Sequence, residues 1–216
     1  HLHRPLPGRP RSCQIKRDTK GWVVIFVCEA PIASLATSGQ AIGLDVGITS
    51  FIASSTGETV PGFKPARRAQ AEMKRRQRAL ARCKRGSKNR RKVKARLACL
   101  HQYVANSRRT FHHQVAARIV RENDLIATED LNVTGLARAA LSREVNDAGW
   151  AAFTTLLIEK AESAGRTVVK VRPHGTSQTC PECGTVKPKT LAERIHRCDC
   201  GCVLDRDVAA ARVILQ

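Results

Sequence analysis

The sequence lacks long apolar runs and has few acidic residues. No apolar stretch approaches the roughly 18 residues that predict a membrane span, and the polar, proline-rich start is unlike a signal peptide. Only 18 Asp and Glu face 38 Lys and Arg, so the 216-residue chain has a formal net charge of +20. This excess predicts a polyanionic partner, most commonly nucleic acid. An anionic membrane surface is the alternative, but no amphipathic anchor is visible.

Nine cysteines are present, and four of them form two close pairs. The pairs are Cys180 with Cys183 and Cys198 with Cys200. Each pair is followed by a glycine, Gly184 or Gly201, which lets the turn adopt a positive φ. Two turns that each offer two thiolates predict a zinc ribbon with a tetrahedral ion. Cys202 leaves the ligand choice open, because it could replace Cys198 or Cys200.

A zinc ion held by four thiolates has no open coordination position. We therefore expect this site to be structural and the chemistry to come from elsewhere. Thiols in zinc-like pairs also indicate a reduced, cytoplasmic protein rather than a secreted, disulfide-bonded one. Four scattered cysteines are expected to be buried or partly buried thiols. They are Cys13, Cys28, Cys83 and Cys99.

Turn signals and apolar patterning predict an alternation of strands and helices. The expected elements are a hairpin over 12–31, three short antiparallel strands over 41–60, a helical hairpin over 64–121, a strand over 124–133, a helix over 149–165 capped by Gly165, a strand over 167–173, the cysteine region, and a helix over 205–216. This order is that of an RNase H-like domain. The predicted class is α/β, with a mixed sheet, flanking helices and an inserted zinc ribbon.

The predicted helical hairpin is strongly basic. Lys and Arg dominate from Lys64 to Arg96, and Glu72 is the only acid in that stretch. A solvated helix face normally mixes both signs, so this bias predicts contact with a nucleic-acid backbone. The second arm places seven apolar residues at helical spacing. They are Val93, Leu97, Leu100, Val104, Phe111, Val115 and Ile119.

Acidic residues stand at informative places in the expected elements. Asp45 lies inside a strand-like apolar stretch, Glu129 ends another, and Asp205 and Asp207 begin the last helix. Singly they have ordinary explanations: Asp45 as a turn residue, Glu129 as an exposed strand end, and Asp205 or Asp207 as a helix N-cap. Asp205 is the expected cap, although the two could exchange roles. Together these acids predict a carboxylate cluster for Mg²⁺, which prefers carboxylates and phosphate oxygens. Like charges on adjacent strands would otherwise repel one another.

These motifs in this order resemble the TnpB family, the OrfB transposases of IS200/IS605 elements, which are relatives of Cas12-type RNA-guided nucleases. "GLDVGITSFIASSTGE" is similar to the first RuvC motif, "IATEDLNV" to the second, and "TSQTCPECG" through "CDCGCVLDRDVAAARVIL" to the zinc ribbon and third motif. The resemblance implies a RuvC core in which Asp45, Glu129 and Asp207 are catalytic and bind Mg²⁺. It also implies structural zinc in the ribbon.

The resemblance further implies an RNA-guided DNA endonuclease of a transposable element. Its partners would be a guide RNA and target DNA, and its location the prokaryotic cytoplasm, with the nucleoid. The implied domains are the end of a wedge-like β domain (1–39), the RuvC core with the basic hairpin at about 64–121 (40–175), the zinc ribbon insertion (176–204), and the last RuvC helix (205–216). The basic hairpin would hold nucleic-acid backbone.

Two departures from the family pattern favour a different function. Ala209 and Val213 replace the asparagines usual in the third motif, and the recognition lobe and most of the wedge domain have no counterpart in this sequence. The alternative is a truncated or decayed RNA-guided DNA-binding protein that does not cleave. A plain zinc-ribbon adaptor for nucleic acid is a third possibility, but it leaves the RuvC-like motifs unexplained.

Overall fold

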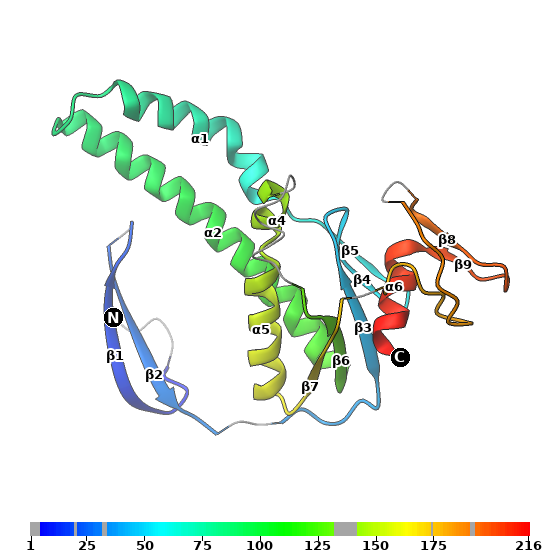
Figure 1. Ribbon diagram of the computed structural model, residues 1–216. Helices are drawn as coiled ribbons and strands as arrows, with labels where there is room; N and C mark the ends of the chain where they lie inside the picture. The colour runs from blue at the N-terminus through cyan, green and yellow to red at the C-terminus, as the bar shows by residue number, and fades with distance from the viewer. Residues whose placement is uncertain (1–4, 20, 32–33, 132–141, 174, 191–192) are drawn as a thin grey trace. The chain divides into compact units, whose positions relative to one another are not determined.

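The computed structural model describes residues 5–19, 21–31, 34–131, 142–173, 175–190 and 193–216. The chain forms two compact units (Figure 1). Unit 1 consists of His1–Ala33 and Pro65–Arg109, and unit 2 of Ser34–Lys64 and Thr110–Gln216. The domain division inferred from the sequence remains a prediction.

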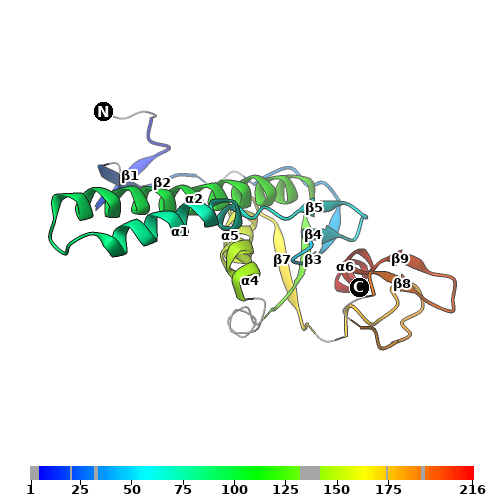
Figure 2. The same ribbon diagram turned by 90° about the horizontal axis from the view of Figure 1, so that it is seen from above.

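Unit 1 contains a β-hairpin and a helical hairpin, as expected. Strands β1 (Arg9–Arg17) and β2 (Trp22–Glu29) pair antiparallel. Helices α1 (Pro65–Arg82) and α2 (Lys88–Glu122) follow, and Figure 2 shows α1 alongside the first part of α2.

The predicted break between the two helices occurs at a short turn. Gly86 has a φ of 80°, which a glycine adopts without strain. Ser87 Oγ then accepts a hydrogen bond from the backbone N–H of Arg90 at 3.1 Å, as an N-cap side chain does. One thiol prediction was wrong for this unit, because Cys13 and Cys99 are exposed; Cys28 and Cys83 are half-buried, as expected.

Unit 2 is built on a five-stranded mixed sheet. Its strands are β3 (Ala41–Val46), β4 (Ser50–Ser54), β5 (Thr59–Pro61), β6 (Leu125–Glu129) and β7 (Thr167–Val171), in the spatial order β5-β4-β3-β6-β7. The first three form the predicted antiparallel meander. β6 pairs parallel with both β3 and β7.

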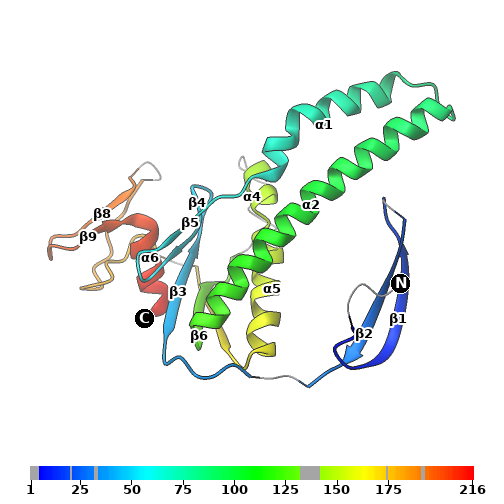
Figure 3. The same cartoon turned by 180° about the vertical axis from the view of Figure 1, so that it is seen from behind.

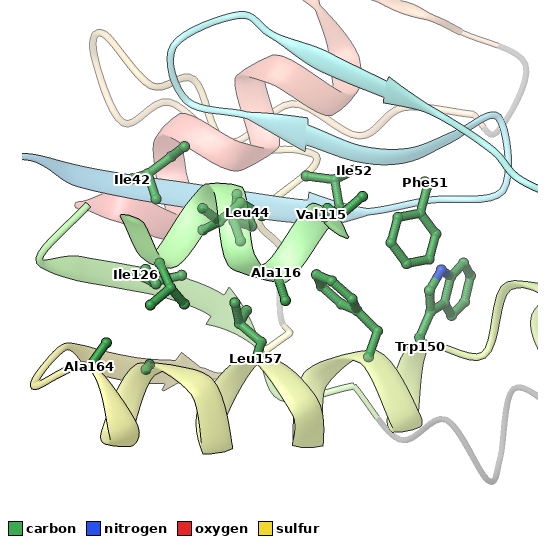
Figure 4. Packing of buried hydrophobic residues seen from close by; sticks show 14 of the residues in the cluster. Ile42, Leu44, Phe51, Ile52, Val115, Ala116, Ile126, Trp150, Leu157 and Ala164 are labelled. Atoms are coloured by element: carbon green, nitrogen blue, oxygen red, sulfur yellow. The ribbon is translucent and has the colours of Figure 1, made fainter. Parts of the chain in front are cut away.

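The two faces of this sheet carry different side chains, because successive strand residues point to opposite sides. Ile42 and Leu44 of β3 and Ile126 of β6 belong to the hydrophobic core, with residues of α2 and α5 (Figure 4). Gly43 and Asp45 alternate with them and face the last helix, α6 (Arg206–Leu215). α6 therefore covers one face of the sheet, and α5 with the end of α2 covers the other (Figure 3).

Two helices connect β6 to β7 beyond the undescribed segment 132–141. Helix α4 (Ser142–Ala148) was not expected, and α5 (Trp150–Ser163) matches the predicted helix. The buried residues of α5 are Trp150, Phe153, Leu157 and Ala161, spaced as one apolar stripe. Its C-cap is Ala164 rather than the expected Gly165, which follows it with a φ of 70°.

The cysteine region forms a small two-stranded sheet before α6. Strands β8 (Ile195–Arg197) and β9 (Val203–Asp205) pair antiparallel, and β9 leads directly into α6. A search of the described residues finds no helix with the length and apolar character needed to cross a membrane.

Candidate active site and metal centre

Asp45 and Glu129 come from adjacent parallel strands. β3 pairs with β6 so that Leu44 is the partner of Thr128. Asp45 and Glu129 are the next residue on each strand, so they stand side by side on the sheet. Alternation puts Asp45 on the side opposite Leu44, which is the side that α6 covers.

Asp207 joins this face from the first turn of α6. Asp205 is the N-cap of this helix: its Oδ1 accepts from the backbone N–H of Asp207 at 2.9 Å and of Val208 at 3.2 Å. The capping role expected for Asp205 is confirmed, and it leaves the Asp207 side chain available. A Cβ placed on Gly47, in the turn after β3, would lie 3.8 Å from Asp207 Oδ2.

Helix α6 approaches the sheet very closely at Gly43. A Cβ built on Gly43 would lie 2.0 Å from the carbonyl oxygen of Ala211. Any other residue at this position would force the helix away from β3. Small side chains also occupy the buried side of α6 here, because Ala209, Ala210 and Ala211 are all at most 2% exposed. The absence of side chains at this contact thus sets the distance from Asp207 to the sheet.

The carboxyl groups strongly influence one another. Burial, together with the charges of Glu129 and Asp207, raises the pKa of Asp45 from its ordinary value of 3.8 to about 8. Burial and the charge of Asp205 also raise the pKa of Asp207. The raised pKa values mean that the ionised forms of Asp45 and Asp207 are disfavoured in the protein by itself. A bound cation would favour these ionised forms.

The spacing of these acids differs from that of a closed single-ion cage. Among the described residues, groups of three or more ligand atoms lying within 4.8 Å of one another occur only in the cysteine region. In a site that holds two ions about 4 Å apart, the carboxylates are divided between the ions, so they do not all contact the same ion. The donor set of Asp45, Glu129 and Asp207 fits Mg²⁺ in its chemistry, since all three offer carboxylate oxygens.

A cavity of about 260 Å³ adjoins Glu129. Its lining includes Val46 from β3 and Trp150, Thr154 and Ile158 from α5. Asp45 and Asp207 do not line it. The cavity thus offers space beside one carboxylate of the cluster.

The cysteine region brings the four predicted cysteines together. The Sγ atoms of Cys180, Cys183, Cys198 and Cys200 all lie within 4.8 Å of one another. Cys180 Sγ is 3.7 Å from Cys200 Sγ, and Cys183 Sγ is 3.5 Å from Cys198 Sγ. Four thiolates around a tetrahedral ion at 2.3 Å would be about 3.8 Å apart. The Thr185 hydroxyl lies 3.3 Å from Cys183 Sγ. Hydrogen bonds to this hydroxyl, to the Thr185 backbone and to the neighbouring thiols lower the pKa of Cys183 to about 6. The cluster can therefore hold a metal ion such as zinc.

Cys202 takes part in a second group, with Cys180 and His196. His196 is only 1% exposed, and its Nδ1 contacts the Nζ of Lys189. A lysine ammonium can only donate, so Nδ1 accepts and the ring proton is on Nε2. A protonated ring nitrogen is not a metal ligand. The group with His196 thus keeps only two sulfur ligands, whereas the other group offers four sulfurs and does not include Cys202.

One contact of the acid cluster could not be inferred from the sequence. Thr176, at the start of the predicted ribbon insertion, donates a hydrogen bond from Oγ1 to Glu129 Oε1. Nothing in the spacing of these two residues, which lie far apart in the chain, predicts that they meet.

Comparison with known proteins identifies relatives along the whole chain. A family model named OrfB_IS605 and described as "Probable transposase" matches residues 25–140, and one described as "Cas12f1-like, TNB domain" matches residues 150–214. The chain is 39% identical to the "Putative RNA-guided DNA endonuclease" of Streptomyces pristinaespiralis, over 98% of this chain and 54% of that protein. It is 28% identical to the "Putative RNA-guided DNA endonuclease InsQ" of Escherichia coli, over 98% of this chain and 58% of that protein.

The chain thus spans about half the length of these relatives. In a solved Cas12f1–sgRNA–target DNA complex, one chain matches 94% of this chain with a TM-score of 0.58 and 17% identity, over 55% of its own length. This likeness confirms the predicted fold class. Because the OrfB_IS605 model matches more than half of the chain, the chain belongs to the OrfB_IS605 (TnpB) family of transposases.

Proposed function

We propose that this chain carries the catalytic portion of an RNA-guided, metal-dependent DNA endonuclease of a transposable element. The supporting observation is the convergence of Asp45, Glu129 and Asp207 at α6, where burial and neighbouring charge raise the pKa of Asp45 to about 8. The relatives' names describe RNA-guided DNA endonucleases, which supports a guide RNA and target DNA as partners.

In this proposal, Asp45, Glu129 and Asp207 hold Mg²⁺ beside the scissile phosphodiester. Bound Mg²⁺ would activate the attacking water and stabilise the leaving oxygen. Asp45 must lose its proton before it can be a ligand, so metal binding and deprotonation are coupled. Glu129, at the end of β6, keeps one oxygen on the Thr176 hydroxyl and has the other for the metal.

The zinc ribbon has a structural role in the same proposal. Cys180, Cys183, Cys198 and Cys200 would fill all four positions of a tetrahedral zinc, which leaves no position for substrate. The ribbon precedes α6 directly, so its folding helps to fix the position of Asp207 in the first turn of that helix.

The basic helical hairpin would contact nucleic-acid backbone. Some of its arginines are engaged within the hairpin; for example, Arg76 Nη1 donates to the Arg96 carbonyl at 2.9 Å, and Arg90 Nη1 to the Leu80 carbonyl at 2.7 Å. Other cations are exposed on it, including Arg78, Lys92 and Lys94. Exposed, flexible cations of this kind bind phosphates without reading sequence.

The test is Mg²⁺-dependent DNA cleavage by the protein purified with its associated RNA, compared with Asp45→Ala. Cleavage that depends on Mg²⁺ and is lost in Asp45→Ala would support the proposal. Asp130→Asn is the matched control, because Asp130 follows Glu129 but is exposed and pairs with Lys170 at 3.2 Å. Undiminished cutting by Asp45→Ala would refute the assignment of this site.

A non-cleaving, RNA-guided DNA-binding protein is the second candidate. Ala209, where the family pattern has asparagine, is buried at 1% exposure on α6, two residues after Asp207. This substitution removes a polar side chain close to the acids. Tight binding of RNA and DNA, with no Mg²⁺-dependent cutting by the unmodified chain, would favour this second function.

A further inference from the structure

Thr176 lies between β7 and the cysteine pairs and contacts the acid cluster. Its Oγ1 donates to Glu129 Oε1, and both side chains are half-buried. A carboxylate that accepts one fixed hydrogen bond loses rotational freedom and keeps its second oxygen in a defined direction. Thr176 therefore limits how Glu129 can present itself to a metal ion.

The position of Thr176 is itself fixed by a tight turn. Gly175 has a φ of 76°, which other residues rarely adopt. Its carbonyl oxygen accepts from the backbone N–H groups of Gln178 and Thr179, both at 2.9 Å. It also accepts from the Thr179 hydroxyl at 2.9 Å. With three donors on one carbonyl, this turn holds Thr176 in place.

The turn is also anchored to the ribbon and to α6. Lys189 Nζ donates to the Ser177 carbonyl at 3.1 Å, and Arg206 Nη2 lies 3.4 Å from Ser177 Oγ. Arg206 Nη1 also donates to the Thr190 carbonyl at 2.7 Å. Arg206 stands between Asp205 and Asp207, and it is the first residue of α6. Ser177, which follows Thr176, therefore contacts the start of the helix that carries Asp207.

We propose that Thr176 is a positioning residue for the metal-binding Glu129, and that the zinc ribbon holds Thr176 in place to serve this role. The inference rests on the proposed function, because it takes Glu129 as a metal ligand. The Thr176 hydroxyl is not itself a ligand. It acts through Glu129, and the ribbon is thereby coupled to the acid cluster by a direct contact.

The test measures divalent-metal affinity, which requires no guide RNA and no cleavage. Mn²⁺ is titrated into the zinc-loaded protein, with bound ion followed by electron paramagnetic resonance. Thr176→Val keeps the shape of the side chain but removes the donor. We expect it to weaken Mn²⁺ binding at the acid cluster by about 10- to 100-fold, the usual effect of losing an outer-shell partner. Thr176→Ser restores the hydroxyl and should bind Mn²⁺ like the unmodified protein.

Thr179→Val is the matched control: it removes one hydroxyl from the same turn but keeps the two backbone hydrogen bonds to the Gly175 carbonyl that close the turn, and this hydroxyl bonds to Gly175 rather than to Glu129. Near-normal Mn²⁺ affinity in Thr179→Val and Thr176→Ser, with loss in Thr176→Val, would support the inference. Equal losses in Thr176→Val and Thr179→Val would overturn it, because they would show a general effect on the turn. Failure of Thr176→Ser to rescue would overturn it too.

Asp45→Asn separates failure of this inference from failure of the proposed function. If Asp45→Asn abolishes Mn²⁺ binding while Thr176→Val leaves it unchanged, the acid cluster binds metal and Thr176 has no positioning role. If Asp45→Asn leaves Mn²⁺ binding unchanged, the proposed metal site is wrong, and the inference about Thr176 falls with it.

Discussion

The two candidate metal sites in unit 2 are built in opposite ways. The ribbon thiolates come from one short stretch of sequence, their sulfurs lie within 4.8 Å of one another, and two of the four cysteines are exposed. The carboxylates come from β3, β6 and α6, which are far apart in the chain, and Asp45 is buried enough for its pKa to reach about 8. The first site depends on local folding, whereas the second depends on the assembled sheet and helix.

The largest expected effect is metal loss from the ribbon. Structural zinc contributes roughly 10 kcal/mol or more to the folding of small zinc modules. A zinc-selective chelator should therefore unfold residues 179–204 first, with early protease cleavage at exposed Arg194 and Arg197, while the five-stranded sheet of unit 2 stays protected. Mass spectrometry of the fragments, beside circular dichroism, measures this.

A matched pair of variants sharpens the ribbon prediction. Cys183→Ser should lose zinc, whereas Cys202→Ser should keep it, because Cys202 lies outside the four-sulfur group. Unchanged protease patterns after verified zinc loss would contradict a structural role. Zinc loss in Cys202→Ser would instead make Cys202 a ligand.

The second effect separates two acids that are neighbours in the sequence. Asp207→Asn should reduce cleavage by roughly 10³-fold, about 4 kcal/mol of transition-state stabilisation. Asp205→Asn should cut nearly normally, because asparagine caps a helix as well as aspartate does. Rates of DNA cutting at saturating Mg²⁺ measure both. The reverse pattern would exchange the roles of Asp205 and Asp207.

The third effect concerns stability and pH in metal-free protein. The folded pKa of Asp45, about 8, lies above its ordinary value of 3.8, so the folded state holds a proton that the unfolded chain releases. Its contribution to stability is fully present below about pH 4 and is lost as pH rises through about 8. Relative to Asp45→Asn, the free energy of unfolding should thus fall by about 1.4 kcal/mol for each pH unit inside this window.

Urea unfolding of both proteins in the presence of a chelator, repeated from pH 5 to pH 9, measures this difference. Adding Mg²⁺ should stabilise only the unmodified protein at the alkaline end. Parallel pH profiles for the two proteins would contradict a buried, proton-holding Asp45.

The smallest expected effect is in the basic hairpin of unit 1. Replacing Arg78, Lys92 and Lys94 by glutamine should weaken nucleic-acid binding modestly and reduce the salt dependence. Each lost phosphate contact lowers the slope of log affinity against log salt by about 0.9 for duplex DNA. Fluorescence anisotropy over a salt series measures the slope. Arg121→Gln, on α2 within unit 2, is the control and should leave it unchanged.

The sequence carried enough information for most of the fold and for the positions of the acids. The apolar stretch around Asp45 and the one that ends in Glu129 predicted that both acids would stand on strands, as they do, whereas the parallel pairing of these two strands was not predicted. The N-cap preference of aspartate predicted the role of Asp205. Both signals are local, so a single sequence was sufficient.

Other features depend on contacts between distant segments. The Thr176–Glu129 hydrogen bond joins residues on either side of β7 and two helices, so no spacing rule predicts it. Helix α4 has only seven residues, too few for a clear periodic pattern. Cys13 is exposed because every residue of β1 is exposed, and Cys99 is an exposed residue of α2; the scattered cysteines gave no pattern from which to infer either.

The close approach of α6 to Gly43 has a consequence for how this chain can vary. The contact is between backbone and backbone, so no rearrangement of side chains can compensate for an added carbon. One methyl group at position 43 would act as a spacer, leaving every carboxylate and thiol chemically intact while moving Asp207 away from Asp45. Gly43→Ala would thus separate folding from assembly of the acid cluster. This variant would keep every functional group and lose only the short distance between Asp207 and Asp45.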